Sequence, residues 1–186
     1  MKKVLLLITF LASVITTNAQ VKVGDATLPS KVSVANKDLT INGSGIRQKL
    51  WFDLYAAGLY LTEKSSNAEK IVAMDQPMQI KMDILSSLIS TKKLLDAFKS
   101  GIEKGNPASE VTRLKPKTEQ FLSFIKNEIK VGNVYDLIYE PGVGTKLLEN
   151  GNLLGTIQGL DFKVLLFNIW LSKTPVDDDL KEGLLN

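Results

Sequence analysis

The chain has 186 residues, of which 23 are Lys or Arg and 20 are Asp or Glu, so its formal net charge is +3. It contains neither Cys nor His, which excludes disulfides, thiol nucleophiles, Cys/His zinc sites and Ser-His-Asp triads. Because basic and acidic residues nearly balance, no basic face is implied, and nucleic acid is not an expected partner. Nothing in the sequence implies a cofactor or a bound metal ion.

The first nineteen residues are typical of an export signal. A basic start precedes an apolar run over residues 4–15, which is too short to span a bilayer. Small residues then stand before a cleavage point that follows Ala19. We therefore expect a cleaved signal peptide over residues 1–19, a single domain over residues 20–186, and a periplasmic or secreted protein. No second long apolar run follows, so no transmembrane segment is expected after cleavage.

The stretch from Leu39 to Glu63 is the predicted axis of the fold. Residues 21–23, 31–34 and 39–41 alternate as short strands do. Asn42-Gly43-Ser44-Gly45 predicts a turn, because glycine reaches backbone conformations that other residues avoid. In residues 51–62, both the odd-numbered and the even-numbered side chains are largely apolar. Since these two sets point to opposite faces of a strand, the pattern predicts a strand covered on both faces. Asp53 is the exception, so we expect it near a strand end or beside a partner.

Arg47 stands between this predicted turn and the predicted strand. A guanidinium held there beside apolar surface is suited to binding a carboxylate or polarising a carbonyl group. The alternative is an ordinary exposed arginine at the start of a strand. The residues alone favour this alternative, since arginine is mostly exposed in folded proteins.

The middle of the chain alternates between helical and strand patterns. Residues 65–74 predict a short helix capped by Ser66 or Asn67, and residues 78–85 predict a strand with one solvent-exposed face. Ser90 or Thr91 begins a helix that ends at Gly105. Residues 107–127 are helical, with a break at Pro116.

The last third predicts three strands followed by two helices. The strands cover residues 134–139, 145–148 and 153–157, with glycine-rich turns between them. A mostly buried helix covers residues 160–171, and Asp177 caps a final helix. Because strands and helices are partly segregated along the chain, we expect an α+β fold in which helices cover an antiparallel sheet.

Four motifs in this order resemble those of the chalcone isomerase-like family. They are NGSGIR with YAAGLYL over residues 42–61, YEPGVGT over 139–145, GTIQG over 155–159, and LLFNIWLSKTPVDDDLKEGLL over 165–185. The resemblance covers essentially the whole mature chain and is nearest to the secreted bacterial branch. It implies the chalcone isomerase fold, an open-faced β-sandwich in which a long antiparallel sheet packs against a layer of helices.

The resemblance also implies candidate residues. In plant chalcone isomerases an arginine binds a substrate oxygen, and threonine and tyrosine hydroxyls polarise the ketone. Related plant members bind fatty acids through the arginine and a tyrosine. The arginine matches Arg47, and the threonine before the family's G-V-Y-L run falls on Tyr55. The later tyrosine falls near Glu110 or Val111, and the threonine of the penultimate helix falls on Ile169. Most polarising hydroxyls are thus replaced, which favours ligand binding over ring closure.

Our leading hypothesis is an exported protein that binds a small apolar acid, such as a fatty acid, in a pocket between sheet and helices. Arg47 would bind the carboxylate and Tyr55 would donate a hydrogen bond. Phe52, Asn168 and Trp170 complete the predicted ligand-binding set. For Trp170, plain core packing is an equal alternative.

Two other hypotheses remain open. The first is an isomerase or intramolecular lyase acting on an enone, with Arg47 and Tyr55 as catalytic candidates and Tyr135 or Tyr139 as further donors. The replaced hydroxyls count against an enzyme. The second is an envelope interaction module without a ligand. It predicts that side chains fill the space beside Arg47 and that Arg47 pairs with Asp53.

Overall fold

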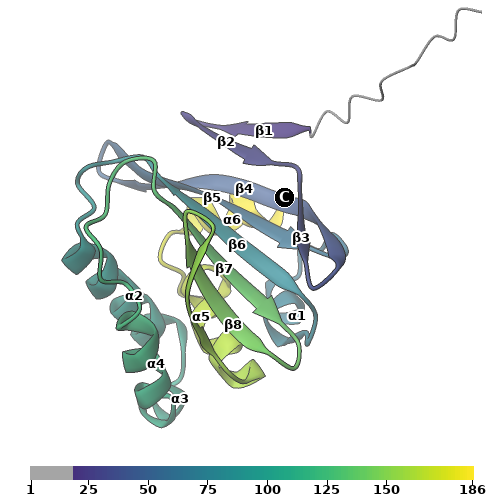
Figure 1. Cartoon of the computed structure of the whole chain (residues 1–186), viewed down its shortest axis with the longest axis vertical. Helices are drawn as coiled ribbons and strands as arrows, with labels where there is room; N and C mark the ends of the chain where they lie inside the picture. The colour runs from purple at the N-terminus through teal and green to yellow at the C-terminus, as the bar shows by residue number, and fades with distance from the viewer. Residues whose placement is uncertain (1–18) are drawn as a thin grey trace, which may run out of the picture.

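The computed structural model describes residues 19–186, which form a seven-stranded antiparallel sheet with helices packed along one face (Figure 1). The expected α+β architecture is therefore confirmed. All but the last residue of the expected signal peptide lie outside the described residues. The strands are adjacent in the order β3 (Lys31–Val34), β4 (Lys37–Lys49), β5 (Phe52–Leu61), β6 (Met78–Ile84), β7 (Val134–Glu140), β8 (Gly144–Glu149) and β9 (Asn152–Ile157).

Six helices lie in the described part of the chain, and the main core lies between them and the sheet. They are α1 (Ala68–Ala73), α2 (Thr91–Gly105), α3 (Ala108–Arg113), α4 (Lys115–Leu122), α5 (Leu160–Leu171) and α6 (Asp178–Leu185). Helix α5 has the predicted bounds and is buried on most sides. The caps also match prediction, since Asn67 accepts from Lys70 N at 2.9 Å and Asp177 accepts from Leu180 N at 2.8 Å.

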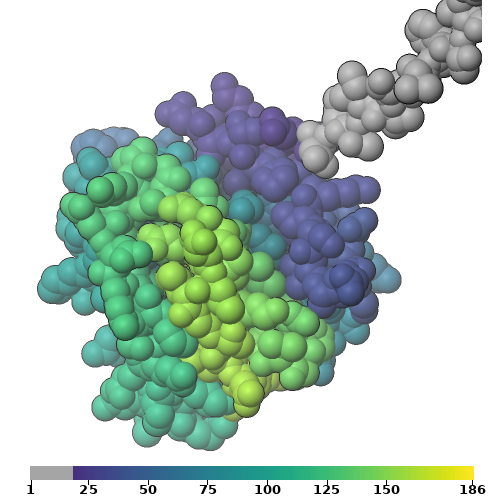
Figure 2. Space-filling model, viewed as in Figure 1, coloured from purple at the N-terminus to yellow at the C-terminus, as the bar shows by residue number. Residues whose placement is uncertain are grey.

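A separate hairpin covers the other face of the sheet. Strands β1 (Gln20–Val23) and β2 (Ala26–Pro29) pair with each other and form the purple segment at the top of Figures 1 and 2. Leu28 of this hairpin packs in a second core with Leu39, Ala56 and Tyr60. Ala56 and Tyr60 belong to β5, and Leu59 of β5 lies in the main core instead. Strand β5 is therefore covered on both faces, as its composition predicts.

The predicted solvent-exposed face of β6 is wrong at Gln79, whereas Lys81 and Asp83 on the same face are partly exposed. Gln79 on that face is buried, and its side-chain amide donates to Asp136 Oδ1 of β7 at 2.7 Å. Lys81 Nζ lies 2.7 Å from the same carboxylate oxygen. Gln79 and Lys81 thus share Asp136 as a partner on the neighbouring strand, and their polar groups are satisfied there rather than by bulk water.

The predicted turn at residues 42–45 is also wrong, because these residues lie in the middle of β4. Helix α6 crosses β4 at this point. A Cβ atom on Gly43 would overlap the carbonyl oxygen of Gly183, and one on Gly45 would lie 3.1 Å from Leu180 Cδ1. The glycines are therefore needed for the close approach of a helix, and the chain reverses later, at Leu50 and Trp51.

A buried lysine joins two of the helices. Lys163 of α5 is fully buried, and its Nζ donates to the carbonyls of Ile71, Val72 and Met74 at 3.0, 2.6 and 2.9 Å. These carbonyls end α1, where helical backbone lacks intrahelical donors. The ammonium group therefore satisfies the end of α1 and holds it against α5.

Gly43→Ala tests the close approach of α6. We expect the free energy of unfolding to fall by about 1–3 kcal/mol, because the added methyl group overlaps Gly183 and α6 must move. Urea denaturation measures the change. Ser44→Ala is the matched control, since Ser44 lies on the opposite face of the strand and its hydroxyl makes no hydrogen bond within the described residues. Equal stability of the two variants would contradict the close packing.

Candidate functional site

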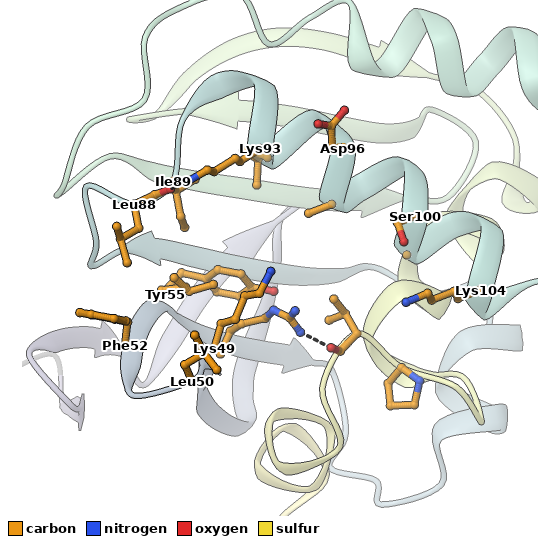
Figure 3. Close-up of a pocket in the computed structure, with 17 residues that line it drawn as sticks. Lys49, Leu50, Phe52, Tyr55, Leu88, Ile89, Lys93, Asp96, Ser100 and Lys104 are labelled. Carbon is orange, nitrogen blue, oxygen red and sulfur yellow. Dashed lines mark hydrogen bonds between the residues drawn. The ribbon is translucent and has the colours of Figure 1, made fainter.

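The register of β4 and β5 places Arg47 opposite Tyr55, so both side chains lie on the helix-covered face of the sheet. A pocket of about 620 Å³ lies between these strands, α2 and the segment after α5 (Figure 3). Its apolar lining includes Leu54, Ile89, Leu94, Ala97, Pro175 and Val176. The structure therefore brings the two leading site residues together at one largely apolar cavity.

Arg47 is held at the pocket wall by the segment between α5 and α6. Its Nη1 donates to the carbonyl oxygen of Val176 and lies 3.8 Å from Asp177 Oδ2. The Arg47 side chain is 18% exposed, and its other N–H groups donate to no acceptor in the described part of the protein. The guanidinium is thus fixed in position but keeps donors for a ligand.

Asp53 is not the partner of Arg47, so this prediction of the interaction-module hypothesis is wrong. Gln48 Nε2 donates to Asp53 Oδ1 at 2.6 Å near the start of β5. Asp53 therefore has the partner and the position that its polarity requires. The space beside Arg47 is a cavity, which also contradicts the expectation that side chains fill it.

Tyr55 presents a neutral hydroxyl to the pocket. Trp170 Nε1 donates to this hydroxyl oxygen at 3.0 Å. Burial raises the pKa of Tyr55 to about 12, so the hydroxyl keeps its proton at neutral pH. That proton has no acceptor within residues 19–186, which leaves it available to a ligand oxygen.

The other predicted ligand-binding residues have different roles. Phe52 lines the outer end of the pocket. Trp170 is 2% exposed and packs edge-on against Phe98, with ring centroids 6.1 Å apart, so it is a core residue that positions Tyr55. Asn168 donates to Asn106 Oδ1 at 2.9 Å and lines a separate surface hollow. The structure therefore does not bring Asn168 to the pocket of Arg47.

The tyrosines of the last three strands do not reach the pocket either. The Tyr135 hydroxyl donates to Glu149 Oε1 at 2.9 Å, and the Tyr139 hydroxyl donates to Asp75 Oδ1 at 2.6 Å. Neither residue lines the cavity, and Ile169 is buried in the core. Tyr55 is thus the tyrosine that lines this pocket.

Three lysines of the lining were not singled out from the sequence. Lys49, Lys93 and Lys104 line the pocket with one acidic residue, Asp96, which pairs with Lys92 at 2.5 Å. Lys93, Ala97, Ser100 and Lys104 follow helical spacing along α2, beside its buried stripe. This spacing is the signal that could have found them. With Arg47, they make the pocket a site of positive potential, which favours an anionic ligand.

Within residues 19–186, no group of three acidic side chains is arranged to hold a metal ion. None of the helices found in residues 19–186 is long and apolar enough to cross a membrane.

The fold and the site define a class of protein: an α+β domain with a basic-lined pocket between an antiparallel sheet and its helical layer. A family model described as chalcone isomerase-like matches residues 20–186, and the chain belongs to the chalcone isomerase-like family. The expected chalcone isomerase fold is thereby confirmed.

A solved structure has the same fold. The crystal structure of a fatty-acid binding protein from Arabidopsis thaliana superposes with a TM-score of 0.68 and 16% sequence identity. The match covers 86% of this chain and 91% of the plant chain. The comparison with curated proteins gave no match.

The buried tyrosines predict a sharp alkaline transition. Burial raises the pKa of Tyr55 to about 12 and also raises the pKa values of Tyr60, Tyr135 and Tyr139. The folded pKa values exceed the unfolded value of about 10, so the folded state favours the protonated hydroxyls. This stabilisation is fully present below about pH 10 and is lost as the pH rises through the folded pKa values.

Phenolate absorbance should therefore appear together with loss of far-ultraviolet circular dichroism, above about pH 11. A titration that follows both signals in one sample measures this coupling. Tyrosines that ionise near pH 10 while the circular dichroism stays native would contradict their burial. In Tyr55→Phe the phenolate amplitude should fall, and the remaining tyrosines should still ionise with unfolding.

Proposed function

We propose that this protein binds a small apolar acid, such as a fatty acid, in the pocket between α2 and strands β4 and β5. One observation carries the proposal: a guanidinium with unused donors lies on the wall of a largely apolar cavity. The volume of about 620 Å³ is within the usual range for small-molecule sites. The fatty-acid binding protein with the same fold supports this ligand class.

The ligand's two ends would meet different surfaces. Its carboxylate would accept hydrogen bonds from Arg47 and from the hydroxyl of Tyr55. Its apolar chain would lie against Leu54, Ile89 and Leu94. The surrounding lysines would raise the local concentration of an anion without touching it.

A second candidate is isomerisation of an enone. The observation that favours it is Tyr55, a neutral donor on the strand pair that holds Arg47. A ketone oxygen held by both groups would be polarised toward an enolate. Turnover of a hydroxychalcone that is lost in both Tyr55→Phe and Arg47→Ala would support this reaction, and its absence removes the flavonoid substrate.

Arg47→Ala tests the binding proposal. After removal of bound lipid, a fluorescent fatty acid is titrated into wild type and variant, and native mass spectrometry gives the stoichiometry. We expect the dissociation constant to rise by about tenfold or more, because a charge-assisted hydrogen bond to the carboxylate is lost. The matched control is Arg113→Ala, since Arg113 forms a surface ion pair with Glu110 outside the pocket.

A fatty alcohol of the same chain length separates charge recognition from apolar binding. The alcohol should bind wild type and Arg47→Ala with similar affinity, because it has no carboxylate for the guanidinium to hold. Equal affinity of both proteins for the acid would reject Arg47 as its anchor. If wild type binds neither ligand, the proposed function fails.

We also infer that the protein is exported and processed after Ala19. The basic start and short apolar run support this. The first strand begins at Gln20, and the family match begins at the same residue, which also supports processing after Ala19. The intact mass of protein from the periplasm or medium of a bacterial host should correspond to residues 20–186. Ala19→Arg should block processing, whereas a full-length mass in the wild-type protein would refute export by this route.

A further inference from the structure

Exposed apolar side chains gather at one end of the sheet. Among the described residues, seven large hydrophobic side chains are exposed, and six of them lie at this end: Leu50, Trp51, Phe52, Leu88, Val131 and Leu153. The strand pairing accounts for their common position. It places the start of β5, the end of β6, the start of β7, the end of β8 and the start of β9 in this order along one end of the sheet. Val143, in the turn between β7 and β8, lies at the opposite end.

The tip of this surface is the turn between β4 and β5, visible at the upper left of Figure 1. Leu50 is 81% exposed and Trp51 is 93% exposed. Leu50 also has a φ of 57°, a left-handed conformation that costs a residue with a Cβ atom roughly 1–2 kcal/mol. Folding gains nothing from exposing these two side chains, so the tip indicates a contact outside the chain.

Basic groups flank the apolar tip. Lys49 ends β4, and Lys93 lies in the first turn of α2 beside Leu88, whose carbonyl accepts from Lys93 Nζ at 3.0 Å. Within residues 19–186, neither lysine belongs to an ion pair. Exposed tryptophan with leucine and phenylalanine, bordered by lysine, is a composition suited to the interface of a negatively charged bilayer.

The tip is continuous with the pocket. Leu50, Phe52 and Leu88 line its outer end, and Figure 3 shows them gathered there, while Lys104 lies at the other end. A surface that contacted this end of the sheet would therefore face the pocket opening.

We propose that this end of the sheet docks on the surface of a bilayer that contains anionic lipids, with Leu50, Trp51 and Phe52 entering the headgroup region. The lysines pair with lipid headgroups, and the apolar tip is buried in the interface. This docking does not depend on the proposed ligand. If both hold, an apolar acid passes between bilayer and pocket without crossing bulk water.

Vesicle binding tests the proposal, with Trp51 as a built-in reporter. Vesicles of phosphatidylcholine mixed with phosphatidylglycerol are added to the mature protein. Trp51 emission should shift to shorter wavelength and be quenched by brominated lipid, while Trp170 is already buried. In co-sedimentation, Trp51→Ser should weaken binding by about tenfold or more. Lys49→Gln should weaken it by about fivefold.

Two controls make the outcomes distinct. Val143→Ser removes an exposed apolar side chain at the opposite end of the sheet and should bind vesicles like the wild type. Arg47→Ala should also bind vesicles normally, so that loss of fatty-acid binding and loss of docking are separate results. Docking is overturned if mixed vesicles do not bind, if Trp51→Ser binds unchanged, or if pure phosphatidylcholine binds equally well. Dimerisation that Trp51→Ser abolishes, without vesicle binding, would assign the surface to a second copy of the chain.

Discussion

The contact between α6 and the glycines of β4 determines where the groups of the site lie. Gly43 and Gly45 let the helix backbone approach the strand more closely than any side chain would allow. The segment that enters α6 is thereby brought over Arg47, and its Val176 carbonyl accepts a hydrogen bond from the guanidinium. Two glycines thus position an arginine that lies on the same strand.

The register between β4 and β5 places the second polar group of the site, the hydroxyl of Tyr55. Opposing positions of an antiparallel pair point to the same face, so Tyr55 lies beside Arg47 whatever the surrounding residues are. Trp170 then fixes the phenol from the core side. The pocket is built from a sheet pair, one helix and one connecting segment, and its polar groups are held by elements that the core already fixes in place.

Local patterns in the sequence predicted most elements but not the long-range reasons for some residues. Helix α5 and the Asn67 and Asp177 caps follow from periodicity and capping chemistry, which act within a few residues. Gly43 suggested a turn because its helical partner is distant in the chain, and Gln79 suggested solvent because its partner lies on another strand. Asn168 was misplaced because α5 is buried on most sides, which leaves no periodicity to separate its faces.

The carboxylate of Asp177 has two partners of positive charge or polarity. Its Oδ1 accepts from the Leu180 N–H at 2.8 Å, while its Oδ2 lies 3.8 Å from the guanidinium of Arg47. Asp177 therefore has the amino-terminal end of α6 as a partner as well as the arginine, and the helix dipole at that end favours negative charge. Because the Asp177 carboxylate does not depend on Arg47 alone, a movement of the arginine side chain would leave no buried carboxylate without a partner.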